Sequence, residues 1–208
     1  MQRLGIFGGT FNPPHNGHLY IAGQAMEKAR LDKVIFLPCG NPPHKKVDGD
    51  VAAVHRLAMT RLAVKDDLRF KVSDLEVCES KADISKKSYT SETLERFAKE
   101  YPGERLCFVV GADSLRDMES WHCPERIFEL AEIIVVSRGG IDDKTVEEKT
   151  DLYQKKYNAD ITVVQVSPVE LSSSVLREKI RSGYSLLDTV PKSVLEYIEK
   201  NRIYKENV

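Results

Sequence analysis

Near its start the chain reads LGIFGGTFNPPHNGH at residues 4–18, an apolar run that leads into a loop rich in glycine, proline and histidine. Residues 4–7 have the length and apolar character of a buried strand, and the glycines and prolines behind them force a turn. We expect a helix to begin near Gly17. Its buried face has the three- and four-residue spacing of a helix packed on a sheet, at His18, Ala22, Ala25, Met26 and Ala29.

Two histidines therefore stand where a strand ends and a helix begins. Gly8 and Gly9 allow the backbone to approach a ligand closely, and a helix N-terminus offers unpaired N–H groups and partial positive charge. His15 and His18 can donate hydrogen bonds to the same ligand. Singly, a histidine near a helix start is more often a surface or capping residue, and a Gly-Gly pair more often a turn. In combination they favour a polyphosphate site.

Two familiar nucleotide-binding motifs are absent from the sequence. No G-x-x-x-x-G-K-[ST] occurs, and the glycines do not follow G-x-G-x-x-G. This argues against a P-loop enzyme and against a dinucleotide-binding dehydrogenase.

Length and composition point to one globular domain over residues 1–208, with 41% hydrophobic residues and a formal net charge of −1. That charge balance gives no basic field for nucleic acid or a membrane surface, so we expect neither partner. The chain enters a core strand without a signal-like leader, and no apolar stretch approaches the length of a membrane span. We therefore expect a cytoplasmic protein. The scattered cysteines are read as reduced thiols, and no metal-ligand set is expected.

Strand-like runs alternate with helical patterns along the chain, which predicts a doubly wound, mostly parallel α/β sheet with helices on both faces. The expected strands are 4–7, 34–37, 106–110, 133–136 and 161–166. The expected helices are 18–30, 51–64, 91–101, 125–130, 144–157, 173–181 and 192–201. Residues 70–72 and 75–77 are interpreted as two further short strands. Ligands of such sheets bind beyond the carboxyl ends of the strands.

Four segments that follow strands or open helices add polar candidates. The proline-rich loop at 38–46 can hold His44 and Lys45 over a site, or it can be an exposed basic turn. Thr90 or Ser91 can cap a helix whose start receives an anion.

Behind the strand at 106–110, Gly111 allows close backbone approach, and Asp113 can cap a short helix or bind ribose hydroxyls. Trp121 can fill a core or offer a flat face to a heteroaromatic ring. Near the C-terminus, Ser173 and Ser174 open a helix with Arg177 one turn further along, an arrangement that suits a polyphosphate, while Ser172 is interpreted as an ordinary helix cap.

Residues 9–18 fit G-x-F-x-P-x-H-x-G-H, and the chain thereby resembles the nucleotidyltransferases that carry an H-x-G-H motif. The resemblance implies a Rossmann-like sheet and transfer of a nucleotidyl group from ATP or CTP. It also implies that His15 and His18 contact the nucleotide phosphates. Residues 173–177 resemble the second motif of this family, [ST]-[ST]-x-[IVL]-R, which binds the β and γ phosphates. The implied ATP-binding set is Gly8, Gly9, Thr10, Phe11, His15, His18, Gly111, Asp113, Ser173, Ser174 and Arg177.

Further segments resemble the branch of the family that joins nicotinate mononucleotide to ATP for NAD synthesis: PHK at 43–45, SYTSETL at 88–94, and GADSL at 111–115 followed by a tryptophan. The implied mononucleotide-binding residues are His44, Lys45, Tyr89, Thr90 and Trp121. The resemblance implies that the Thr90 backbone holds the nicotinate carboxylate and that Trp121 stacks near the pyridine ring. It also implies that Lys45 binds in the region of the mononucleotide phosphate. His122 stands where relatives often have tyrosine.

The reaction implied by this resemblance is direct in-line transfer, with His15, His18 and Arg177 as the catalytic residues and Mg²⁺ bound through the ATP phosphates. Other readings stay open from sequence. The acceptor can be nicotinamide mononucleotide or another phosphate such as phosphopantetheine, or the chain can bind ATP without turning it over. The sequence also leaves open whether the protein is a homo-oligomer.

Overall fold

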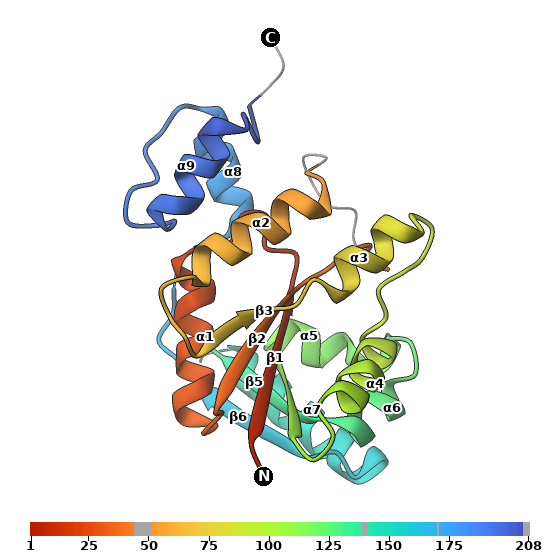
Figure 1. Cartoon of the computed structure of the whole chain (residues 1–208). Helices are drawn as coiled ribbons and strands as arrows, with labels where there is room; N and C mark the ends of the chain where they lie inside the picture. The colour runs from red at the N-terminus through yellow and green to blue at the C-terminus, as the bar shows by residue number, and fades with distance from the viewer. Residues whose placement is uncertain (44–50, 139–140, 170, 206–208) are drawn as a thin grey trace. The chain divides into compact units, whose positions relative to one another are not determined.

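The computed structural model describes residues 1–43, 51–138, 141–169 and 171–205. Within these ranges six strands form one sheet in the order β3-β2-β1-β4-β5-β6 (Figure 1). They are β1 (Arg3–Gly9), β2 (Lys33–Pro38), β3 (Phe70–Val72), β4 (Arg105–Gly111), β5 (Glu132–Ser137) and β6 (Ile161–Gln165). The ladders between β1 and β4, β4 and β5, and β5 and β6 are all parallel. The predicted α/β fold with a mostly parallel sheet is confirmed.

Helices fill the connections between the strands, as crossover connections of a parallel sheet require. They are α1 (Asn16–Lys28), α2 (Ala53–Val64), α3 (Leu75–Ala82), α4 (Thr90–Glu100), α5 (Ala112–Asp117), α6 (Pro124–Leu130), α7 (Ile141–Tyr157), α8 (Ser173–Arg181) and α9 (Lys192–Lys200). A 3-10 turn at Met118–Ser120 follows α5.

The predicted strands are confirmed to within one or two residues at each end, and so is the short strand at 70–72. The predicted strand at 75–77 is wrong, because these residues open α3. The Leu75 N–H donates a hydrogen bond to the Ser73 hydroxyl oxygen, 3.3 Å away, at the start of that helix. Three residues with apolar side chains at the first and third positions fit a strand, but they fit the first turn of a helix equally well.

The described residues group into two compact units, each built from three separate segments of the chain. The first unit comprises residues 1–8, 21–35 and 88–168. The second comprises residues 9–20, 36–87 and 169–208, as far as these are described.

The core of the first unit is the central part of the sheet. Ile6 lies opposite Phe108 on the neighbouring strand β4, and Phe108 lies opposite Ile133 on β5. All three side chains are buried, as expected for a parallel strand covered on both faces. Helices α4 and α6 pack together, as do α5 and α7. Figure 1 shows these four helices around the strands β4, β5 and β6.

A buried carboxylate on β5 connects this strand to β1, β4 and β6. The Glu132 side chain, 4% exposed, accepts hydrogen bonds from Arg3 at 2.8 Å, from Arg105 at 2.9 Å and from the Thr162 hydroxyl at 2.8 Å. Burial would by itself raise the pKa of Glu132, but the bonds from Arg3 and Thr162 and the arginine charges together hold the pKa below its usual range. The carboxylate therefore stabilises the folded state in its ionised form.

Replacing Glu132 with glutamine is expected to lower the free energy of unfolding by about 2 kcal/mol, because two arginines lose their buried partner. The corresponding decrease in Tm is roughly 4–8 °C for a chain of this size. The wild-type advantage is complete above pH ~4.3, the ordinary glutamate value, and declines as the pH falls through the lowered pKa of the folded state. Denaturant unfolding between pH 3 and pH 7 measures both effects.

Glu95→Gln is the matched control, since the Glu95–Arg126 pair at 2.8 Å is solvent-exposed on both sides. Exposed ion pairs contribute about 0.2–1 kcal/mol, so this variant should change stability much less. Equal losses of unfolding free energy in the two variants would show that burial of Glu132 does not increase its contribution to stability.

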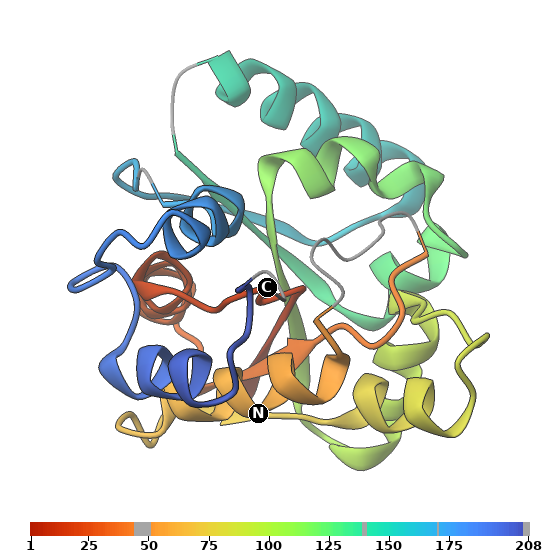
Figure 2. The same cartoon turned by 90° about the horizontal axis from the view of Figure 1, so that it is seen from above.

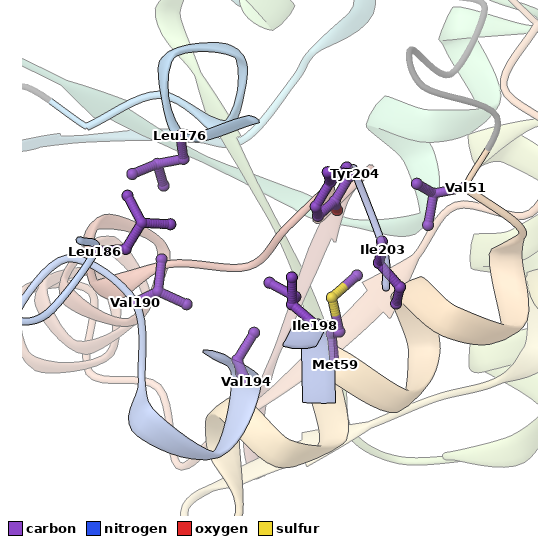
Figure 3. Close-up of a cluster of buried hydrophobic side chains, with 9 residues drawn as sticks. All are labelled: Val51, Met59, Leu176, Leu186, Val190, Val194, Ile198, Ile203 and Tyr204. Carbon is purple, nitrogen blue, oxygen red and sulfur yellow. The ribbon is translucent and has the colours of Figure 1, made fainter. Parts of the chain in front are cut away.

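The second unit is built around α2. This helix packs against β3, α3 and α9, and Figure 2 shows α2 and α9 side by side. Apolar side chains from α2, α8, α9 and the segments next to α9 form one cluster (Figure 3). Its buried members are Val51, Met59, Leu176, Leu186, Val190, Val194, Ile198, Ile203 and Tyr204.

Two simpler predictions can also be compared with the structure. All four cysteines are free thiols, and Cys107 is buried as predicted, which raises its pKa to about 11. In the part of the chain that the structure describes, no helix combines the length and apolar character needed to cross a membrane.

Candidate active site

The residues that lead into the H-x-G-H motif form a buried loop behind β1, and α1 begins at Asn16 within the motif. Phe11, Asn12, Pro13 and His15 are all buried. Phe11 has a φ of 49°, in the left-handed region that few residues other than glycine adopt, and the Asn12–Pro13 peptide bond is cis. The left-handed backbone at Phe11 is costly for a residue with a side chain, and hydrogen bonds within the second unit support this loop at several points.

The two histidines of the motif are stacked. Their ring centroids lie 3.7 Å apart with 33° between the planes, and the Phe11 ring meets His18 edge-on at 5.1 Å. The backbone N–H of His15 donates to Nδ1 of His18 at 3.2 Å. Because Nδ1 accepts this bond, the proton of the neutral His18 ring lies on Nε2. Nε2 is therefore the hydrogen-bond donor that His18 can offer to a phosphate oxygen.

The absence of a side chain at Gly17 leaves the space that the His15 ring occupies. A Cβ atom added at Gly17 would lie 2.9 Å from Nδ1 of His15 and 3.0 Å from its Cε1, closer than carbon atoms normally approach. The H-x-G-H spacing thus has a steric reason, since any side chain at the third position would displace the first histidine.

The start of α8 is joined to this loop by its side chains. The Ser173 hydroxyl donates to the Pro13 carbonyl at 2.9 Å, and Nη1 of Arg177 donates to the Asn12 carbonyl at 2.8 Å. Nη2 of Arg177 also lies 3.3 Å from the Ser174 hydroxyl oxygen. The two motifs, separated by about 160 residues in the sequence, therefore meet within the second unit.

Ser172 is confirmed as the helix cap, since its hydroxyl oxygen accepts from the Val175 N–H. Capping by Ser172 leaves the next two serines to other roles. Arg177 is 7% exposed, so its guanidinium is a buried positive charge beside the loop.

Arg56 on α2 is a third support of the site, and the sequence did not single it out. It is 1% exposed and donates to the carbonyls of Thr10 at 2.8 Å, Cys39 at 2.6 Å and Gly40 at 3.2 Å. It thereby joins the loop behind β1 to the loop behind β2. Burial lowers the pKa of Arg56, although the nearby Cys39, Tyr204 and Glu76 act in the opposite direction.

Tyr204 is the other residue that sequence reasoning missed. Its hydroxyl donates to Oδ1 of Asn12 at 2.6 Å. For Arg56 a sequence signal exists, because the arginine shares its helix face with Thr60 and Val64, which are buried. Tyr204 follows the last predicted helix, and no pattern in the sequence links it to residue 12.

Most of the predicted residues of the first unit lie next to β4 or at the start of α4. Gly111 ends β4 and is the N-cap of α5. Asp113 is therefore not the cap that was predicted but lies in the first turn of α5, exposed and paired with Arg116 at 3.0 Å. The N-cap of α4 is Tyr89 rather than Thr90 or Ser91, so Thr90 is the first residue of that helix.

Aromatic side chains of the first unit form two ring pairs that include predicted acceptor residues. The rings of Tyr89 and His122 lie 4.3 Å apart at 32°, and Trp121 meets Phe108 edge-on at 6.4 Å. Trp121 is only half-buried, and His122 is exposed. The indole thus does more than fill the core, because part of it remains accessible.

The structure therefore brings together most of the predicted ATP-binding residues within the second unit, namely Gly9, Thr10, Phe11, His15, His18, Ser173, Ser174 and Arg177. The first unit carries Gly8, Tyr89, Thr90, Gly111, Asp113 and Trp121. His44 and Lys45 lie outside the described residues. Among the residues that are described, no three His, Cys, Asp or Glu side chains form a group that could hold a metal ion.

Comparison with known proteins supplies the family. The cytidylyltransferase-like family model matches residues 6–179. A probable nicotinate-nucleotide adenylyltransferase of Clostridium acetobutylicum is 40% identical over 204 residues, covering 98% of this chain and all of that protein. A protein of the same description from Carboxydothermus hydrogenoformans is 37% identical, with 98% of each chain covered.

The fold is also that of a solved structure, the Plasmodium falciparum nicotinic acid mononucleotide adenylyltransferase complexed with NaAD, with a TM-score of 0.76 over 98% of both chains. At 18% identity this likeness concerns the fold alone. The family match and the full-length relatives agree with the H-x-G-H loop and its serine-arginine partner. The chain therefore belongs to the cytidylyltransferase-like nucleotidyltransferases, in the group of the nicotinate-nucleotide adenylyltransferases.

Proposed function

We propose that this protein transfers the adenylyl group of ATP to the phosphate of nicotinate mononucleotide, giving nicotinate adenine dinucleotide and pyrophosphate. The observation that carries the proposal is the joining of the two motifs. Ser173 and Arg177 at the start of α8 hydrogen-bond to the loop that holds the stacked His15 and His18. This concentrates imidazole donors, a guanidinium and helix N–H groups around one loop, which suits the triphosphate of ATP.

The chemistry asks for positioning and charge stabilisation rather than a covalent intermediate. A phosphate oxygen of the mononucleotide attacks the α-phosphorus of ATP in line, the bond to the bridging oxygen breaks, and pyrophosphate leaves with the electron pair. The attacking oxygen is already an anion, so no general base is needed. The protein must hold two polyanions close together and stabilise the charge that grows on the leaving oxygen.

His18 suits the second task. Its Nδ1 accepts from the His15 backbone N–H, so the proton of the neutral ring is on Nε2, and Nε2–H is suited to donate to an oxygen of the reacting phosphates. Ser173, Ser174 and Arg177 suit the β and γ phosphates that depart. ATP enters as its Mg²⁺ complex, with the ion carried by phosphate oxygens and water, as Mg²⁺ commonly is.

The acceptor would lie against the first unit. Thr90 opens α4, so its backbone N–H is one of the groups that a helix start leaves available for a carboxylate. The partly accessible face of Trp121 suits a pyridine ring, as aromatic rings stack on one another. Lys45 and His44 are proposed for the mononucleotide phosphate on the resemblance to relatives alone.

The proposal is tested by pyrophosphate release from MgATP with nicotinate mononucleotide or nicotinamide mononucleotide as acceptor. We expect a strong preference for the acid, and we expect Trp121→Ala to raise the KM of the acceptor while changing the KM of ATP little. Preference for nicotinamide mononucleotide would contradict the proposed roles of Thr90 and Trp121, but it would still support adenylyl transfer from ATP. If no pyrophosphate is released with any of the acceptors, phosphopantetheine included, the proposed transfer is wrong. The alternative is then a protein that binds ATP without turning it over.

A further inference from the structure

The side-chain oxygen of Asn12 is held by a residue from the far end of the sequence. Asn12 stands three residues before His15, and its carbonyl accepts from Arg177 at 2.8 Å. Its Oδ1 accepts from the Tyr204 hydroxyl at 2.6 Å, in a buried hydrogen bond. Asn12 is thus fixed through both its backbone and its side chain, at the point where the chain turns toward the two histidines.

Tyr204 is itself held firmly. It is 6% exposed and belongs to the apolar cluster of Figure 3, together with Met59, Ile198 and Ile203. Its φ is 67°, in the left-handed region that an aromatic residue adopts only at an energetic cost. The surrounding packing maintains this backbone, and the result is a hydroxyl directed at Asn12.

The Tyr204 hydroxyl can act only as a donor in this bond, because Oδ1 of Asn12 is an acceptor. Burial raises the pKa of Tyr204, while the charges of Arg177 and Arg56 act in the opposite direction. The net effect is upward, so the hydroxyl keeps its proton at neutral pH and above. The hydrogen bond is therefore present throughout the pH range in which the enzyme would be assayed.

We propose that Tyr204 is a positioning residue for adenylyl transfer, whose hydroxyl fixes Asn12 and through it the loop that carries His15 and His18. Tyr204 hydrogen-bonds to the loop and not to the reacting groups, so its effect is on where the imidazoles stand. Transfer between two polyanions depends on such placement, since a displacement of the order of 1 Å can cost about a hundredfold in rate. The consequence for catalysis rests on the proposed function.

The chain offers a matched pair of substitutions. Tyr204→Phe removes one hydroxyl and keeps the ring that packs in the cluster. Tyr197→Phe, on α9 next to the same cluster, also removes one hydroxyl, whose partner is Nδ1 of His55 at 3.0 Å. The two variants lose similar bonds in the same unit, but only the first bond leads to the H-x-G-H loop.

In steady-state assays with MgATP and nicotinate mononucleotide, Tyr204→Phe should lower kcat about fivefold to tenfold, with both KM values within about twofold of wild type. Tyr197→Phe should keep the wild-type kcat. Thermal unfolding of both variants provides the measure of stability. A wild-type kcat in Tyr204→Phe, or equal losses in the two variants, would overturn the proposal.

Histidine ring NMR signals give a second readout that does not depend on turnover. The signals of His15 and His18 should shift in Tyr204→Phe while those of His55 stay, and the reverse pattern should hold in Tyr197→Phe. If wild-type protein releases no pyrophosphate, the proposed function fails, and the NMR shifts alone then decide whether Tyr204 positions the loop. Unshifted His15 and His18 signals in Tyr204→Phe would refute that role.

Discussion

Replacing His18 with alanine is expected to lower kcat about 10²–10³-fold, the usual cost of removing one donor that stabilises developing charge. The structure gives the reason. Nδ1 of His18 accepts from the His15 backbone N–H, so the proton of the neutral ring is on Nε2, the donor that we propose acts on a phosphate. The KM of ATP should change by less than about threefold, because the serine, arginine and backbone donors proposed for the triphosphate are unchanged in this variant.

Single-turnover measurement of pyrophosphate release separates the chemical step from binding. His55→Ala is the control, since this half-buried histidine of the same unit bonds to Tyr197 and not to the motif. It should retain wild-type turnover. A His18→Ala protein with normal kcat would remove His18 from the mechanism.

Gly17→Ala should cost about 10- to 100-fold in kcat/KM, a large effect for the addition of one methyl group. The added Cβ would meet the His15 ring at 2.9 Å and the Leu171 side chain at 3.4 Å. The ring is the part able to move, so His15 leaves its stack with His18. Activity should therefore fall much more than stability does.

The same helix supplies a control for this substitution. Gly23 also lies in α1, and a Cβ added there meets no atom within 4 Å. Gly23→Ala should therefore stabilise the protein by about 0.5–1 kcal/mol, as expected in a helix interior, and leave kcat/KM unchanged. Kinetics and thermal unfolding of both variants test the argument. If Gly17→Ala behaved like Gly23→Ala, the steric role of Gly17 would be refuted.

Most of the fold was predictable because the buried strands are short apolar runs with turn residues behind them. The run at 106–110 is an example, and it lies within the buried strand β4. The segment at 75–77 was not predictable in this way. Glu76 is buried there, and its carbonyl oxygen would lie 2.1 Å from a Cβ at Gly40, so a tertiary contact with a distant loop accompanies this helix.

For the site, spacing identified the residues of the two motifs but not what holds them. The fixed spacing of histidines, serines and arginine is visible in the sequence. Only the structure shows that Ser173 and Arg177 hydrogen-bond to the loop before His15, within one unit. The bond between Tyr204 and Asn12 spans 192 residues, and no local pattern encodes it. For Arg56 the helix spacing indicates burial, but its three partners are backbone carbonyls, and these carry no residue type that a sequence could reveal.

The hydrogen bond from Tyr204 to Asn12 can form only after nearly the whole chain has been synthesised. Asn12 precedes Tyr204 by 192 residues, which at 5–20 residues per second corresponds to about 10–40 s of translation. Throughout that interval the nascent chain carries a complete H-x-G-H motif without the tyrosine that anchors it. A chain that stops between residues 177 and 204 keeps every residue of both motifs and still lacks this support for its loop.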